Sequence, residues 1–166
     1  MLYLLDANVL ITANNTYYAI DQVPEFWEWL AHQGAGGSIK MPLEVIEEVK
    51  AGSKEDRLVE WIQNDGNHDA LLLKEDVDPI LVQNVVNNGY ANDLTDDEIA
   101  QLGRDPFLVA HAMAGDERCV VTTEVSKPSK IRQNRKVPDV CTSLGIECRN
   151  TFELTRVLGF RTSWKR

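Results

Sequence analysis

Short apolar runs of about four residues alternate along this chain with longer segments of helical character. We interpret four of these runs as strands: Leu2–Leu5, Ser38–Met41, Cys119–Thr122 and Ile146–Cys148. Continuous apolar runs are typical of strands buried on both faces, and such strands form parallel sheets with helices on either side. The sequence therefore predicts a three-layer α/β domain with a mostly parallel central sheet flanked by helices.

The segments between these strands carry start and stop signals for helices, mainly Pro or a capping residue at the start and Gly at the end. Val9–Ile11 starts a helix or a second turn. The other predicted helices cover residues 24–34, 42–50, 54–63, 95–102, 107–114, 138–144 and 152–158. Ala70–Lys74 and Ile80–Val86 fit a strand or a helix equally well. No repeat or linker divides the chain, so we expect residues 1–166 to form one domain.

The first residues and the cysteines indicate the cellular compartment. The apolar run at the N-terminus has no positive flank and is interrupted by Asp6, which is not typical of a signal peptide or an anchor. Cys119, Cys141 and Cys148 are odd in number and have no C-x-x-C spacing, so we expect reduced thiols with a structural role. These features predict a cytoplasmic protein that does not cross a membrane.

The net charge of −9 is unevenly distributed. Residues 1–118 carry 22 acids against 7 Lys and Arg, whereas residues 119–166 carry 10 Lys and Arg against 4 acids. Because such cations bind the phosphates of nucleic acids, the basic part of the chain is the predicted place for an anionic partner. Its densest part holds Lys127, Lys130, Arg132, Arg135 and Lys136. A solvated loop without a ligand is the alternative.

Two acids directly follow predicted strands. Asp6 comes after Leu2–Leu5, and Glu124 comes two residues after Cys119–Thr122. Ligands of open α/β sheets bind beyond the carboxyl ends of the strands, so we expect both acids at that edge. The alternatives are a turn aspartate that bonds its own backbone and a solvated loop glutamate.

Two further acids belong to predicted helices. Asp105 precedes a proline, which is typical of an N-cap, and its second oxygen would remain free for a ligand. The helix Pro42–Lys50 carries three glutamates. Glu48 lies about 105° from the centre of the apolar stripe, against roughly 145° for Glu44 and 155° for Glu47. Glu48 is therefore predicted to lie at the border of the core, and three solvated glutamates are the alternative.

Acids that converge without a basic residue beside them repel each other unless a cation joins them. Oxygen ligands select Mg²⁺ or Mn²⁺, which lower the pKa of bound water and stabilise the oxygens of a phosphodiester displacement. The three histidines lack zinc-site spacing, and motifs of serine hydrolases, P-loop proteins and dinucleotide binders are absent. A Mg²⁺- or Mn²⁺-dependent site is therefore predicted at Asp6, Glu48, Asp105 and Glu124.

Four stretches resemble a known family: Leu4–Ile11, Ile39–Val49, Asp105–Ala112 and Val120–Glu124. In order and spacing they resemble the PIN-domain nucleases, particularly the VapC-type toxins and a related group of small bacterial proteins. The resemblance covers nearly the whole chain. It implies a metal-dependent endoribonuclease, often the toxin of a type II toxin–antitoxin pair, that is usually a homodimer and is inhibited by a small antitoxin whose tail blocks the active site.

The resemblance also assigns roles to single residues. By the family pattern, Asp6 is the acid after the first strand, Glu48 the helix acid and Asp105 the third acid. Glu124 takes the fourth place, where many members have Asp or Asn.

Three more residues are implied to support these acids. Lys136–Cys141 resembles a feature of the related small group, so Asp139 could supply or share the fourth role. Asn8 and Thr122 would orient Asp6 and its neighbours by hydrogen bonds.

Two other functions compete with a nuclease. A haloacid-dehalogenase-like phosphatase needs a second aspartate two positions after Asp6, where this chain has Asn8. The stronger alternative is a catalytically weak PIN-like binding module in which the acids serve structure or protein contacts.

Overall fold

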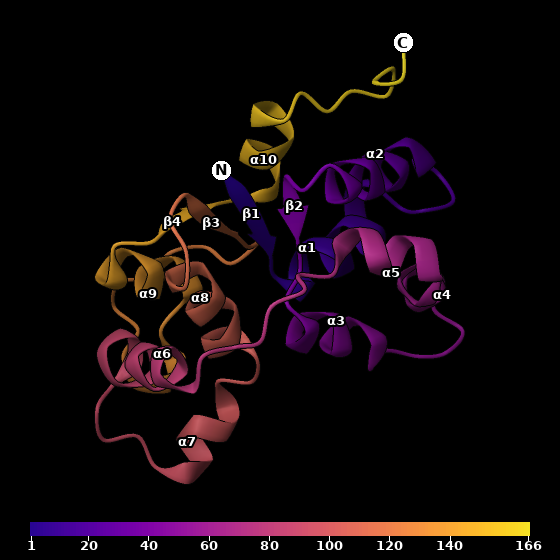
Figure 1. Cartoon of the computed structure of the whole chain (residues 1–166). Coiled ribbons are helices and arrows are strands. Elements are labelled where there is room, and N and C mark those ends of the chain that lie inside the picture. Colours follow the sequence, from indigo (N-terminus) through magenta and orange to yellow (C-terminus); the bar gives the residue numbers. More distant parts are fainter.

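The computed structural model describes residues 1–166 and contains a four-stranded sheet surrounded by helices (Figure 1). The strands are β1 (Leu2–Leu5), β2 (Ile39–Lys40), β3 (Arg118–Val121) and β4 (Glu147–Arg149). Their spatial order is β2-β1-β3-β4, and all three neighbouring pairs are parallel. The predicted α/β fold with a parallel central sheet is confirmed.

Helices fill every connection between these strands. Between β1 and β2 lie α1 (Ala7–Thr12), the π-helix η1 (Ala13–Tyr17) and α2 (Pro24–Ala35). Between β2 and β3 lie α3 (Leu43–Lys50), α4 (Arg57–Gln63), α5 (Asp65–Leu71), α6 (Pro79–Asn84), the π-helix η2 (Val85–Tyr90), α7 (Asp96–Gln101) and α8 (Asp105–Met113). The short 3₁₀-helix η3 (Arg132–Asn134) and α9 (Val137–Leu144) precede β4, and α10 (Thr151–Val157) follows it.

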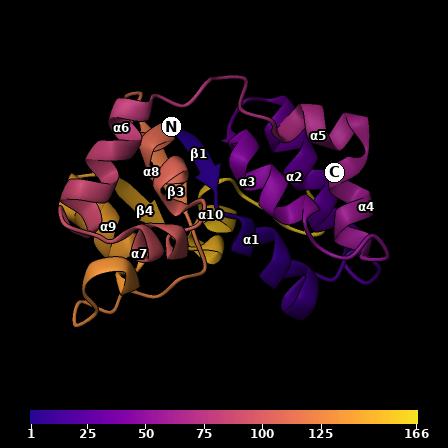
Figure 2. The ribbon, with the colours of Figure 1, turned by 90° about the horizontal axis from the view of Figure 1, so that it is seen from below.

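The helices form two groups around the sheet. The first includes α8, which packs on β1 and β3, and α9, which packs on β4, whereas α2 packs on β2. In both views α6, α8 and α9 lie together at one side of the molecule and α2 to α5 at the other, with β1 between them (Figures 1 and 2). The sheet is therefore enclosed, as its apolar strands require.

The two segments that the sequence left open have different structures. In Ala70–Lys74 only Ala70 and Leu71 are helical, as the end of α5, and Leu72 forms an isolated parallel bridge with Met41. Ile80–Val86 is helical, because α6 continues directly into η2.

Several predicted boundaries were wrong by one to three residues. The α4 helix begins at Arg57 because the Asp56 side chain caps it, accepting a hydrogen bond from the Leu58 N–H at 2.8 Å. Strand β4 is shifted by one residue, to Glu147–Arg149.

One cluster of 35 buried apolar residues forms the core. The largest of its fully buried side chains are Trp27, Trp29 and Phe26 of α2. Cys119 and Cys141 also belong to it, and all three cysteines are free thiols. No helix combines the length and the apolar character that crossing a membrane requires.

The register of the sheet brings distant segments to one edge. Leu5 of β1 pairs with Val121 of β3, and Val121 pairs with Arg149 of β4. The residues that follow these strands therefore lie beside one another at the carboxyl edge. Asp6 and Thr122 are two of them.

Candidate functional site

Asp6 lies at the end of β1 with only 5% of its surface exposed. Its Oδ2 accepts two hydrogen bonds of 2.9 Å, from the Thr122 hydroxyl and from Asn8 Nδ2. It does not cap α1 with its side chain. Because both side-chain bonds go to Oδ2, the other oxygen keeps its lone pairs for a ligand. The hydrogen bonds expected from Asn8 and Thr122 are present, and the role of these residues in a functional site stays a prediction.

The same network orders the chain after β3. Asn8 Oδ1 accepts a hydrogen bond from the Thr123 N–H at 3.0 Å, and Thr122 Oγ1 accepts one from the Glu124 N–H at 3.2 Å. Asn8 and Thr122 therefore connect the turn after β1 to the turn after β3. This connection fixes the backbone of Glu124 relative to Asp6.

Glu124 is also fixed at its carboxylate. Its Oε2 accepts a hydrogen bond of 2.7 Å from the N–H of Val137, the first residue of α9. Helix N-termini favour such negative groups. The charge of Glu124 raises the pKa of both Asp6 and Asp105.

Asp139 is bonded to the loop that follows Glu124. Its two oxygens accept hydrogen bonds from the Ser126 hydroxyl and the Lys127 N–H. Asp139 is not among the largest influences on the pKa of Asp6 or Asp105. Asp139 therefore holds the loop that follows Glu124, and its share in the fourth acidic position stays a prediction.

Asp105 is the first residue of α8, preceded by Arg104 at the cap position, and makes no side-chain capping bond. The expectation of a capping aspartate was wrong. Burial raises the pKa of Asp105 to about 8, with further increases from Asp6, Glu124 and Glu48, while Lys136 opposes the shift. A carboxyl group that neither caps its helix nor forms an ion pair is available to a ligand.

The burial of the three glutamates of α3 only partly follows the order predicted from their angles to the apolar stripe. Glu44 is the more buried one, with 21% of its side chain exposed, because its Oε2 lies 3.4 Å from Nε2 of the buried His111 on α8. Glu48 is exposed, so its predicted place at the core border was wrong. Nevertheless, Glu48 and not Glu44 or Glu47 is the α3 charge that acts on Asp6 and Asp105.

These four residues, Asp6, Glu48, Asp105 and Glu124, are called the acidic cluster below. Burial raises the pKa of Asp6 to about 6, and Glu48 and Glu124 add to the increase against the lowering effect of the Thr122 hydrogen bond. Partial burial of its carboxylate also raises the pKa of Glu48, although the residue is exposed at the surface, and Arg104 opposes this increase. None of the four carboxylates forms an ion pair with Lys, Arg or His.

The donor chemistry of the acidic cluster fits a hard divalent cation, because it offers carboxylate oxygens that form no ion pair with Lys, Arg or His. However, no three His, Cys, Asp or Glu side chains converge tightly enough to form a ready-made metal site. A cation would therefore have to draw the carboxylates together. The side chain of Glu48 is exposed and forms no ion pair that would have to break.

The basic side chains of segment 127–136 fall into two groups, those bound within the protein and those without an ion pair. Arg132 binds both oxygens of Glu98 at 2.8 and 2.9 Å and Asp93 at 2.8 Å. Arg135 donates to the carbonyls of Gly89 and Asp139 and to the Ser143 hydroxyl. These two arginines are occupied within the protein. The side chains without an ion pair are Lys127, Lys130 and Lys136.

Two residues near the acidic cluster were missed in the sequence. Arg104 lies close enough to Glu48 to lower its pKa, and its guanidinium carbon is 5.8 Å from the centre of the Phe107 ring. Because Arg104 directly precedes Asp105 in the sequence, its closeness to the acids could have been predicted. Tyr90, the last residue of η2, feels the charges of Asp105, Glu124 and Asp6. No local pattern in the sequence distinguishes Tyr90.

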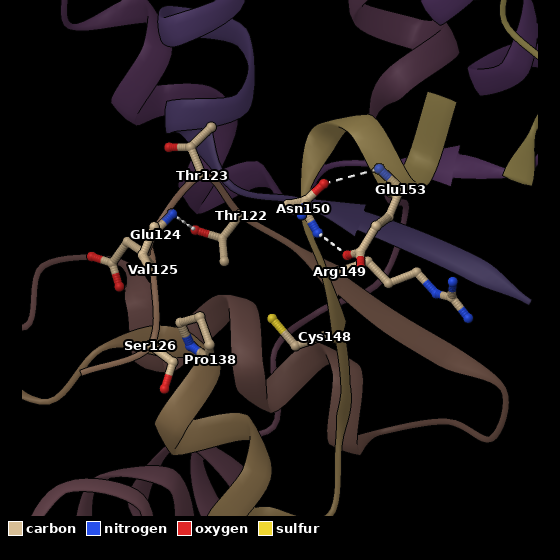
Figure 3. Close-up of a pocket in the computed structure, with 10 residues that line it drawn as sticks. All are labelled: Thr122, Thr123, Glu124, Val125, Ser126, Pro138, Cys148, Arg149, Asn150 and Glu153. Carbon is tan, nitrogen blue, oxygen red and sulfur yellow. Dashed lines mark hydrogen bonds between the residues drawn. The ribbon is translucent and has the colours of Figure 1, made fainter. Parts of the chain in front are cut away.

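A pocket of about 250 Å³ adjoins Glu124 at the ends of β3 and β4. Glu124 and Ser126 lie on one wall, facing Asn150 and Glu153, with the Cys148 thiol between the walls (Figure 3). Asn150 and Glu153 are engaged in the capping box of α10. The lining carries two acids and one arginine that is paired with Glu147. This pocket therefore lacks the free cations of a phosphate site.

The fold and the site define an α/β protein with unpaired carboxylates at the carboxyl edge of its sheet. Residues 3–162 match the family DUF4411, described as a domain of unknown function, and the chain belongs to this family. The match includes all four members of the acidic cluster. A search of curated proteins and a search of solved structures each found no match.

Proposed function

We propose that this protein is a Mg²⁺- or Mn²⁺-dependent endoribonuclease that hydrolyses RNA phosphodiesters at the acidic cluster. The observation that carries the proposal is the buried Asp6, oriented by Asn8 and Thr122 and surrounded by acids that form no ion pair with a basic side chain. Carboxylates that repel each other lower the stability of the fold unless a cation lies between them. Because these carboxylates lie at the edge where α/β sheets bind ligands, their arrangement favours a site for a cation.

In this proposal Asp6, Glu48, Asp105 and Glu124 would hold the metal. The metal would supply activated water and stabilise the charge that develops on the phosphodiester oxygens. Asn8 and Thr122 keep Asp6 in one orientation, and the first turn of α9 does the same for Glu124. The free Lys127, Lys130 and Lys136 would hold RNA phosphates beside the acids.

The biological role is proposed on the resemblance alone. We infer that the protein acts in the cytoplasm as the toxin of a type II toxin–antitoxin pair. A small antitoxin would be its inhibitor, and a second copy of the chain its partner in a homodimer.

The experiment is cleavage of a labelled single-stranded RNA by purified protein, first in EDTA and then with Mg²⁺ or Mn²⁺. We expect metal-dependent cleavage that Asp105→Asn reduces by about 100-fold or more. Asp116→Asn is the matched control, because Asp116 is exposed and precedes β3 at the other edge of the sheet. Cleavage that persists in EDTA or in Asp105→Asn would refute the proposal.

The second candidate, a binding module without catalysis, is favoured by one observation. No ready-made metal site is present in the structure. This candidate predicts RNA binding through the three free lysines without cleavage in any metal, together with a melting temperature that does not respond to millimolar Mg²⁺ or Mn²⁺.

A further inference from the structure

A hollow of about 340 Å³ lies at the opposite edge of the sheet from the acidic cluster. Its walls are the last turn of α2, which leads directly into β2, and the chain that follows α10. Figure 1 shows this last part of the chain, in yellow, running from α10 to the C-terminus above α2. The acidic cluster is built around the ends of β1 and β3, whereas the hollow lies where β2 begins. The hollow is therefore separate from the site described above.

The lining of the hollow carries positive charge and no carboxylate side chain. Arg161 and Arg166 line it, both are exposed, and neither forms an ion pair. The side-chain bonds of this part of the chain are made by Trp164 and Lys165 instead. Four other arginines are paired with acids, namely Arg57, Arg118, Arg132 and Arg149. In a chain of net charge −9, two free arginines at one hollow are available to an anion.

Negative groups at the end of α2 already have partners. The acid of α2 nearest to His32 in the sequence is Glu28, one helical turn earlier, and its Oε2 lies 2.5 Å from Lys165 Nζ. The carbonyl of Gln33 accepts a hydrogen bond of 3.0 Å from the Ser38 N–H. The carboxylate and the helix end would otherwise repel an anion, and these bonds reduce that repulsion.

The segment that carries the two arginines is anchored on α2 by aromatic rings. The centre of the Phe160 ring is 5.1 Å from that of Trp29, and the Trp164 ring is 4.9 Å from that of His32. Trp164 Nε1 also donates a hydrogen bond of 3.1 Å to a carbonyl of α2. Arg161 lies between these two anchors, so its backbone is held at the hollow before a ligand arrives. Such preorganisation lowers the entropic cost of binding.

We propose that this hollow binds a terminal phosphate group, carried by a nucleotide or by the 5′ end of an RNA. A phosphate monoester has a charge of about −1.5 to −2 at pH 7 and oxygens that accept hydrogen bonds. The guanidinium groups of Arg161 and Arg166 match this charge and offer five N–H donors each. Gln33 and Ser163 add neutral donors to the lining. A backbone phosphodiester carries a single charge and matches the lining less well. The inference does not rest on the proposed function.

The first probe is inorganic phosphate, titrated into the full chain in EDTA by calorimetry, with NaCl of equal ionic strength as reference. We expect saturable binding that Arg161→Gln and Arg166→Gln each weaken by about tenfold or more, because charge-assisted hydrogen bonds are lost. Arg156→Gln is the matched control, since Arg156 is exposed and without an ion pair on α10 but does not line the hollow. No saturable binding by the wild type, or an equal loss in Arg156→Gln, would overturn the proposal.

Two further probes distinguish the sources of the phosphate. They are adenosine monophosphate and one single-stranded RNA with either a 5′-phosphate or a 5′-hydroxyl, measured in EDTA by calorimetry and fluorescence anisotropy. If RNA is the source, the 5′-phosphorylated form should bind more tightly, and Arg161→Gln should remove the difference. If a free nucleotide is the source, adenosine monophosphate should bind while both RNAs bind alike.

One result would overturn the assignment to a terminal phosphate. It is RNA binding that depends on Arg161 but not on the 5′-phosphate, because the hollow would then hold backbone phosphates. These measurements need neither metal nor cleavage. Their failure is therefore distinguishable from failure of the proposed function.

Discussion

Replacing Asp6 by Asn should stabilise the metal-free protein, although it removes a central residue of the proposed site. Asn has the shape of Asp, and its Oδ1 can accept the same bonds from Thr122 and Asn8. In the folded protein the pKa of Asp6 is raised from 3.8 to about 6. The folded state therefore binds this proton more tightly than the unfolded chain does.

The sign and size of the effect follow from this difference. The stability that the Asp6 proton contributes is complete below about pH 4 and is lost as the pH rises through about 6. Above about pH 7 the buried charge costs about 3 kcal/mol of unfolding free energy. Asp6→Asn lacks this cost and also relieves the repulsion on Asp105. The variant should therefore gain stability over wild type as the pH rises.

The assay is urea unfolding in EDTA, followed by tryptophan fluorescence, at several values between about pH 4.5 and pH 8. The stability of Asp6→Asn relative to wild type should increase by about 2 kcal/mol over this range. Asp116→Asn, at the opposite edge, should show no such trend. A difference that is constant with pH would refute the reasoning, because Asp6 would then carry no electrostatic cost.

Three further predictions concern the metal, the RNA and the packing behind Tyr90. Glu48→Gln should reduce both cleavage and the rise in melting temperature caused by Mn²⁺, whereas Glu47→Gln should change neither; equal losses would contradict the assignment to Glu48. Arg132→Gln should lower the melting temperature because it breaks two ion pairs. Substitution of Lys127, Lys130 and Lys136 by Gln should instead weaken RNA binding. Each lost phosphate contact should reduce the slope of log affinity against log salt concentration by about 0.7 in single-stranded RNA. Gly89→Ala should cost about 1–3 kcal/mol in urea unfolding, since the new methyl group would lie 2.7 Å from Val140 Cγ1, and an unchanged midpoint would contradict this close contact.

Local sequence signals were sufficient for the elements that form from neighbouring residues. The apolar run before Asp6 predicted β1, and the Thr95 capping box predicted α7. The position of Asp6 at the end of a parallel strand followed from the same pattern. Such signals succeed because strand burial and helix capping depend on residues only a few positions apart.

Other features were decided only by tertiary packing. Arg132 looked like an RNA ligand in the sequence, but α7 places Glu98 against both of its donor nitrogens. Glu44 is more buried than Glu48 because His111, far away in the chain, packs beside it.

The acidic cluster depends both on local sequence signals and on tertiary packing. The sequence determined which carboxylates stand at the ends of strands and at helix starts, because those positions are set by backbone periodicity. Only the tertiary structure decided which charges act on one another and left the Tyr90 hydroxyl without a partner among them. Charge interactions and burial depend on distances through space, and these are fixed when α8, α9 and η2 pack around the sheet.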